Sequence, residues 1–179
     1  RIRTMVETDE GILPFQRYFV GRRCEPAVKS LRYENAENTL PTPEVQAAFA
    51  AADLKAIILC PSNPFLSIDP ILAIPGYREM IRAANVPVIA VSPIIAGQSI
   101  KGPLAKMMQE MGMPADVRSI AAHYRGLIDI LVVDEQDSRA QLEGVDIRTA
   151  RTLMNTLEDR VALAVTTLEM ARGFRRATP

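Results

Sequence analysis

Cysteine and histidine are scarce in this chain of 179 residues, which has only Cys24, Cys60 and His123. None of the three has the spacing of zinc ligands, so a zinc site is not expected. Two cysteines do not make a disulfide framework, and the reducing cytoplasm is therefore the expected compartment. His123 stands among apolar residues of a predicted helix, and we expect it to have a structural role.

An excess of charge is also lacking, because 21 basic and 21 acidic residues leave a formal net charge of zero. Broad binding of DNA or RNA normally requires a basic excess, so a nucleic-acid partner is not expected. A single pocket needs only a few local cations, which leaves small charged ligands open. Neither a membrane-spanning apolar run nor a signal peptide is recognisable, so we expect no membrane partner.

The sequence does not begin with methionine, and its first residues read as a strand already under way. We therefore expect residues 1–179 to be the C-terminal portion of a single Rossmann-like domain. Hydrophobic residues make up 48% of the chain and charged residues 23%. These proportions allow a buried core and exclude a disordered chain.

Strand-like and helix-like patterns alternate along the chain. Short apolar runs typical of parallel strands lie at 55–60, 87–93 and 128–134, and further strands are expected at 2–7, 25–35 and 144–152. Helical patterns lie at 42–54, 69–86, 102–112, 115–127 and 155–174, with another beginning near Pro14. The last helix has an apolar stripe of Leu157, Val161, Ala164, Val165 and Leu168. The alternation predicts an α/β, Rossmann-like three-layer sandwich with a mostly parallel sheet.

Small polar residues follow the first buried run, in the segment Pro61-Ser62-Asn63-Pro64. In open α/β sheets, ligands bind beyond the carboxyl ends of the strands. The hydroxyl, amide and backbone N–H groups of this segment suit a phosphate oxygen. Ser62 and Asn63 are explained equally well as caps of the next helix.

The segment 92–103, "SPIIAGQSIKGP", follows the second buried run and combines small residues with Lys101. Lys101 stands near an expected helix start at Pro103, where a cation is unfavourable unless an anion is also present. This is a hint of a phosphate site, although a solvated surface lysine is an equal alternative. The segment matches neither the P-loop pattern nor G-x-G-x-x-G.

Acidic residues follow the third buried run, at Asp134, Glu135 and Asp137. Carboxylates at a strand end suit Mg²⁺, which makes Asp134 a candidate metal ligand, but Asp134 fits equally well as a helix cap. Near the N-terminus a separate group is a candidate for contact with an anionic partner. Its members are Arg17, Tyr18, Arg22 and Arg23, although basic residues at a helix end are also explained by the helix dipole.

Four blocks of the sequence carry a resemblance to a known family. They are "RTMVETDEGILPFQRYFVGRRCEPAV", "ILCPSNPFLSIDPILAIPGYREMI", "VPVIAVSPIIAGQSIKGPLAKMMQEMG" and "TLMNTLEDRVALA". In this order they resemble the 2-phospho-L-lactate transferases of deazaflavin coenzyme F-420 biosynthesis. The N-terminal strand of that family, with its glycine-rich turn and early acidic residues linked to Fo and metal, has no counterpart here.

The resemblance implies a Rossmann-like, homodimeric enzyme. It implies transfer of a phospholactyl group, or of a phosphoenolpyruvyl group in bacterial versions, from a guanosine-diphospho donor to the deazaflavin Fo. GMP leaves and Mg²⁺ assists. Our hypothesis places Ser62, Asn63 and Ser67 on the nucleotide or diphosphate, and a facing wall at Ser92, Gly97, Lys101 and Gly102. Lys101 would offset the charge of the diphosphate, and no residue is assigned as a catalytic base.

Two alternatives remain open from the sequence. One is a nucleotide-sugar-binding regulatory protein of the gluconeogenesis-factor type, which has a similar "P…S…P.L..PG" segment. The segment "SPIIAGQSIKGP" fits the transferase pattern better. The other is an inactive fragment that serves only for interaction.

Overall fold

Four parallel strands form the main sheet of the protein. The computed structural model describes residues 1–100, 102–138 and 144–174. In this part of the chain the strand order is β4-β5-β8-β9, with β4 (Ile57–Leu59), β5 (Val88–Val91), β8 (Ile130–Asp134) and β9 (Asp146–Ala150). Every residue of β5 and β8 is buried. Burial on both faces explains why these two strands are apolar up to Asp134 and do not alternate.

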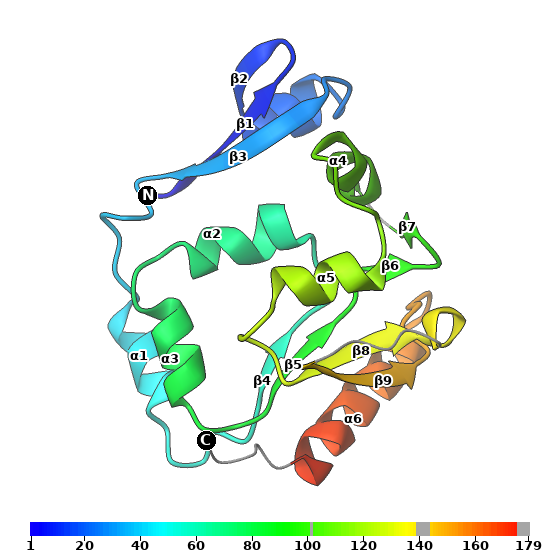
Figure 1. The fold of residues 1–179 in the computed structure, drawn as a ribbon. Coiled ribbons are helices and arrows are strands. Elements are labelled where there is room, and N and C mark those ends of the chain that lie inside the picture. Colours follow the sequence, from blue (N-terminus) through cyan, green and yellow to red (C-terminus); the bar gives the residue numbers. More distant parts are fainter. Residues whose placement is uncertain (101, 139–143, 175–179) are drawn as a thin grey trace.

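Helices lie on both faces of this sheet, as Figure 1 shows. They are α1 (Pro43–Phe49), α2 (Asp69–Leu72), α3 (Tyr77–Ala83), α4 (Leu104–Glu110), α5 (Val117–His123) and α6 (Leu157–Gly173). On one face α4 and α5 pack in the same cluster as Val88 and Leu131. On the other face α6 packs against Ile89 and Ile130, because successive side chains of a strand point to opposite faces. None of the described helices is both long and apolar enough to cross a membrane.

Short elements complete the described part of the chain. They are the hairpin of β6 (Ile94–Ile95) and β7 (Gln98–Ser99), the π-helical turns η1 (Arg17–Gly21) and η2 (Pro64–Ile68), and the 3-10 turn η3 (Glu135–Asp137). The hairpin and η3 follow β5 and β8 at their carboxyl ends. Both therefore stand at the edge of the sheet where α/β proteins bind ligands.

The N-terminal residues form a second, antiparallel sheet with the order β2-β1-β3. Its strands are β1 (Arg3–Thr8), β2 (Gly11–Pro14) and β3 (Val28–Glu34). Figure 1 shows this sheet apart from the parallel one, on the side of α2 and α4. The hydroxyl of Tyr33 donates to the carbonyl of Phe65 at 2.6 Å, and the N–H of Val28 donates to Glu110 at 2.9 Å. The sheets thus share one hydrophobic cluster.

The predicted α/β class with a mostly parallel sheet is confirmed, and so is the start of α1. Thr42 caps this helix by accepting from the N–H of Val45, and Pro43 lies in its first turn. The helix predicted to begin near Pro14 is confirmed as well, because residues 15–21 are helical and end at Gly21, with a π-helical turn from Arg17. Pro14 is the last residue of β2, an edge strand, where a missing N–H is tolerated.

The apolar stripe predicted for α6 differs from the residues that this helix buries. The residues of α6 that are buried are Leu163, Thr167 and Ala171. By contrast, four members of the predicted stripe are between 46% and 67% exposed, namely Leu157, Val161, Val165 and Leu168. The stripe exists in the sequence, but this part of α6 does not face the sheet.

Candidate functional site

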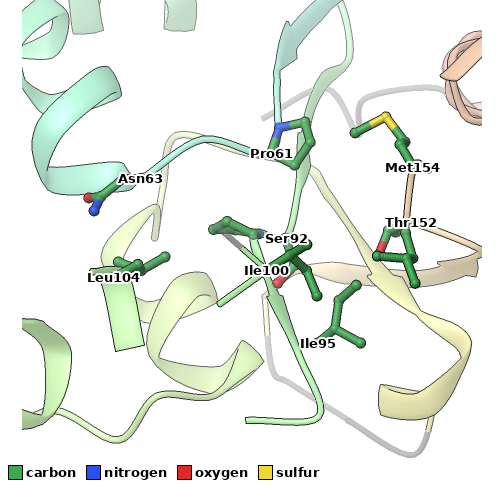
Figure 2. Close-up of a pocket in the computed structure, with 10 residues that line it drawn as sticks. Pro61, Asn63, Ser92, Ile95, Ile100, Leu104, Thr152 and Met154 are labelled. Carbon is green, nitrogen blue, oxygen red and sulfur yellow. The ribbon is translucent and has the colours of Figure 1, made fainter. Parts of the chain in front are cut away.

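A pocket of about 260 Å³ opens at the carboxyl ends of the parallel strands (Figure 2). The residues lining it are Pro61, Asn63, Ser92, Pro93, Ile95, Ile100, Leu104, Thr152, Leu153 and Met154. They come from the loops after β4, β5 and β9. Because these strands are parallel, their loops meet at one edge of the sheet. In Figure 2, Asn63 and Leu104 stand on one side of the pocket and Thr152 and Met154 on the other.

Asn63 fixes the loop after β4. Its side-chain oxygen accepts from the N–H groups of Phe65 at 3.0 Å and Leu66 at 3.2 Å, and so caps η2. Its amide nitrogen lies 3.8 Å from the sulfur of Met107, which is a weak acceptor. The oxygen is therefore used for folding, while the NH₂ group retains the capacity to donate to a ligand oxygen.

Ser92 lies at the base of the pocket, in the turn after β5. The side chain is buried, and its oxygen donates to the carbonyl of Ile94 at 3.0 Å and accepts from the N–H of Ile94 at 3.1 Å. The hydroxyl thus closes a tight turn and sets the direction of the hairpin β6–β7. Ser92 shapes this wall of the pocket by fixing the backbone.

Asp134 at the end of β8 holds the opposite wall in place. One of its carboxylate oxygens accepts from the N–H of Thr152 at 2.9 Å and from its hydroxyl at 3.1 Å. The other oxygen accepts from the backbone N–H and the side-chain amide of Gln136. Burial opposes ionisation of Asp134, but these hydrogen bonds outweigh it and hold the pKa of the carboxyl below its usual value.

The metal prediction for Asp134 stays a prediction, and its surroundings argue for a different role. Both oxygens already accept from protein donors. The carboxylate of Asp137 accepts from the N–H of Ala96 at 3.0 Å and so ties η3 to the hairpin. Among the described residues, no three acidic, cysteine or histidine side chains gather as metal ligands.

The structure brings together only part of the predicted site. Asn63 and Ser92 line the pocket, whereas Ser62 lines a neighbouring hollow beside α6. Ser67 is exposed on η2, and Gly97 and Gly102 are exposed around the hairpin. Lys101 lies outside the described residues.

Among the described lining residues none carries a charge. This part of the pocket offers an amide, hydroxyl groups and backbone, surrounded by apolar side chains such as Ile95, Leu104 and Met154. An apolar cavity with a few polar groups is typical of small-molecule sites. The arrangement can orient a ligand, and the described lining has no cation to balance charge.

The segment Thr152 to Met154 was missed by the reasoning from sequence. The sequence predicts an outer strand at 144–152 and places ligand-binding ends only after the three buried apolar runs. In the structure β9 is parallel to β8, and its end opens at the same edge. The segment "DIRTART" is mostly polar and carries no local signal of this pairing direction.

Three of the candidates outside the pocket are used in packing or pairing within the protein. Tyr18 is buried in the main cluster and is not available to an anionic partner, and Arg22 pairs with Glu10. His123 lies 2.9 Å from the carboxylate of Asp69, with its ring against Phe65, and joins α5 to α2. The structural role expected for His123 agrees with this packing.

A parallel sheet with helices on both faces defines a Rossmann-like α/β protein, and its pocket lies at the carboxyl edge, where such proteins bind ligands. Comparison with known proteins gives the family. The chain belongs to the family described as 2-phospho-L-lactate transferase CofD, whose model matches residues 1–167.

Curated relatives agree with this family. The chain is 39% identical over 167 residues to a 2-phospho-L-lactate transferase of Methanopyrus kandleri, covering 92% of this chain and 53% of the relative. It is 34% identical over 167 residues to one of Methanosarcina mazei, covering 91% and 54%. It is 35% identical over 177 residues to a phosphoenolpyruvate transferase of Streptomyces griseus, covering 95% and 55%. The chain thus spans about half the length of these relatives.

A solved structure supports the fold alone. A member of the UPF0052 family from Bacillus halodurans matches with a TM-score of 0.54 and 14% sequence identity. The match covers 92% of this chain and 58% of that protein. At this identity the likeness concerns the arrangement of the elements and not the ligand.

Proposed function

We propose that this chain carries the donor-binding part of an enzyme that transfers a phospholactyl or phosphoenolpyruvyl group. The observation that carries the proposal is the match of residues 1–167 to the transferase family. All three loops that line the pocket lie inside the matched range. The relative from Methanopyrus kandleri is named for transfer of phospholactate, and the relative from Streptomyces griseus is named for transfer of phosphoenolpyruvate. These names support the two groups in the proposal.

The proposed donor is a guanosine-diphospho compound and the proposed acceptor is the deazaflavin Fo. A hydroxyl oxygen of the acceptor attacks the phosphorus that carries the transferred acid, and a new P–O bond forms. The bond from that phosphorus to the bridging oxygen of GMP breaks, GMP leaves, and the hydroxyl proton passes to solvent or a base. Such transfers depend mainly on positioning and charge neutralisation.

Positioning is what the described pocket can supply. The NH₂ group of Asn63 is held by its cap and can donate to a phosphate or ribose oxygen. Ser92 and Thr152 keep two loop backbones in place, and the apolar walls exclude water from the ligand. Charge neutralisation is assigned to Lys101, which remains a prediction from the sequence.

Mg²⁺ is part of the proposal for a family-length enzyme. The described carboxylates do not fit it well, because Asp134 and Asp137 accept hydrogen bonds from the protein. No step of the proposed reaction is therefore routed through an ion held by these residues. The homodimer and the cytoplasmic compartment stay predictions as well.

Isothermal titration of GDP, GMP and a UDP-sugar into the chain, with Mg²⁺ present, tests the proposal. We expect binding of GDP and weaker or no binding of the UDP-sugar. Binding of the UDP-sugar alone would replace the transferase by a nucleotide-sugar-binding regulator. If no nucleotide binds, the donor site does not lie within this chain.

A further inference from the structure

The tip of the hairpin β6–β7 has a strained backbone. Its loop is Ala96-Gly97, because Ile95 pairs with Gln98 across the hairpin. Both loop residues have a positive φ, 47° for Ala96 and 76° for Gly97, as in the turns that join tight hairpins. Glycine adopts this conformation freely, whereas alanine adopts it at a cost in free energy. A contact from outside the loop is needed to offset this cost.

The carboxylate of Asp137 supplies such a contact. Asp137 is the last residue of η3 and is half-buried. Its Oδ2 accepts from the N–H of Ala96 at 3.0 Å, across 41 positions of the chain. A carboxylate is a stronger acceptor than a neutral group. The bond therefore favours the one backbone conformation in which the N–H of Ala96 points towards η3.

The same short turn also holds a second wall of the pocket. Asp134, which caps η3, accepts from the N–H and the hydroxyl of Thr152. Thr152 lines the pocket from the loop after β9, and Ile95 lines it from the hairpin after β5. Through two carboxylates, η3 thus connects two walls that belong to distant parts of the chain.

The arms of the hairpin have anchors of their own. Ser92 closes the turn before β6, and Ile94 is fully buried in the core. After β7, the hydroxyl of Ser99 donates to the carbonyl of Gly102 at 3.2 Å and accepts from the N–H of Ala105 at 3.4 Å. Loss of the Asp137 carboxylate should therefore release the tip and leave the core folded.

We propose that Asp137 is a positioning residue of the donor pocket. It acts through the backbone of Ala96, and with Asp134 it makes η3 a clamp that fixes the hairpin relative to Thr152. This role rests on the proposed function, because the ligand to be positioned is the guanosine-diphospho donor. An acidic residue near an anionic ligand normally weakens its binding by repulsion. The clamp predicts the opposite sign for loss of the Asp137 side chain.

Titration of GDP into Asp137→Ala and Asp137→Asn measures this sign. Asp137→Ala should raise the Kd by about threefold or more, because the tip loses its acceptor. Asp137→Asn keeps an acceptor oxygen and loses the charge, so it should bind GDP at least as well as the natural chain. The matched control is Glu135→Ala, an exposed position of the same turn, where the Kd should stay within about twofold.

Three outcomes of this titration contradict the clamp. Unchanged or tighter binding by Asp137→Ala would mean that the carboxylate acts only as a charge or not at all. An equal loss of affinity in Asp137→Asn would assign the role to the charge itself, as for a ligand of a cation. All variants should keep the Tm within about 2 °C. A Tm lowered by many degrees in Asp137→Ala would make its loss of affinity a result of unfolding.

Ala96→Gly tests the strain directly. Added to Asp137→Ala, it should restore at least part of the lost affinity for GDP, because glycine adopts a positive φ without cost. An affinity that stays as low as in Asp137→Ala alone would show that strain at Ala96 is not what Asp137 offsets.

The order of the hairpin tip is a measurement that needs no ligand. NMR order parameters of the amides of residues 96–98 should fall below about 0.6 in Asp137→Ala and stay near about 0.85 in Glu135→Ala. If GDP does not bind the natural chain, the proposed function fails, and these order parameters still decide whether η3 is a clamp. Order parameters that stay high in Asp137→Ala reject the clamp, with or without GDP binding.

Discussion

The face of the parallel sheet that carries α4 and α5 is closed, whereas the face that carries α6 is open beside β4. On the closed face, strand residues such as Leu131 and Val133 are fully buried in a cluster that reaches the antiparallel sheet. On the open face, α6 covers Ile89 and Ile130 but not Ile58. Similar apolar residues on the two faces thus differ in burial because of what packs over them.

The comparison separates what stabilises this chain from what remains available for interaction. The candidate pocket lies at the carboxyl edge of the sheet, where loops from β4, β5 and β9 meet. Its walls are fixed by Asn63, Ser92 and Asp134 through hydrogen bonds within the described chain. The pocket is therefore built from this chain even though one face of the sheet is not covered by it.

The largest expected effect compares the same substitution on the two faces. Leu131→Ala leaves a cavity in the closed core and should lower the free energy of unfolding by about 2–5 kcal/mol. Leu168→Ala, on the open face, should lower it by less than about 1 kcal/mol. Urea unfolding of both variants measures the difference. Equal losses of unfolding free energy in the two variants would mean that Leu168 is as well covered as Leu131.

A smaller loss in the free energy of unfolding is expected from Asp134→Asn, which replaces a carboxylate that accepts four hydrogen bonds. The amide can accept with only one atom, so Thr152 or Gln136 loses its partner at a cost of about 1–3 kcal/mol. Because Thr152 lines the pocket, nucleotide affinity should fall too. Urea unfolding and titration give the two readouts, and Glu135→Gln, at an exposed position of η3, is the control. Full stability in Asp134→Asn would contradict this role.

Asn63→Ala should cost about 1 kcal/mol through loss of the η2 cap, and should weaken nucleotide binding. Asn38→Ala, at an exposed site away from the pocket, is the matched control and should change neither quantity. Ser67→Ala should leave binding intact if the pocket in Figure 2 is the site, since Ser67 does not line it. A larger loss of binding in Ser67→Ala than in Asn63→Ala would favour the placement expected from the sequence.

The smallest expected effect is the loss in acid of the stabilisation that Asp134 supplies, because this loss is absent at neutral pH. The folded pKa of Asp134 is below the unfolded value, so its stabilisation is complete above the unfolded pKa. This stabilisation is lost as the pH falls through the folded pKa. The stability difference between the natural chain and Asp134→Asn should stay constant down to a pH of about 4 and shrink below it. A difference that already shrinks between about pH 5 and 6 would assign the effect to another group.

The sequence predicted those features that depend on local chemistry. The cap at Thr42, the parallel strand at 88–91 and the strand at 130–134 follow from a few neighbouring residues. The helix expected near Pro14 begins one residue later, at Phe15, because Pro14 itself pairs with Met5 in the antiparallel sheet. Tertiary pairing is not visible in the local pattern.

The site was predicted in part for the same reason. Ser62 and Asn63 are adjacent in sequence, yet they line different hollows, because the loop turns between them. Thr152 was missed because its place depends on β9 being parallel to β8. For α6 the helical spacing of apolar residues predicted the helix correctly. The spacing alone did not show which side of the helix packs against the sheet.

The most direct test of the central claim is hydrogen exchange of the chain with and without GDP. The account predicts slower exchange in the loops that line the pocket, at residues 61–66, 92–99 and 152–154, with little change along the stripe of α6. Slower exchange confined to Ser62 and α6 would move the site to the neighbouring hollow. No change in any of the three loops, with GDP bound, would contradict the placement of the donor in this pocket.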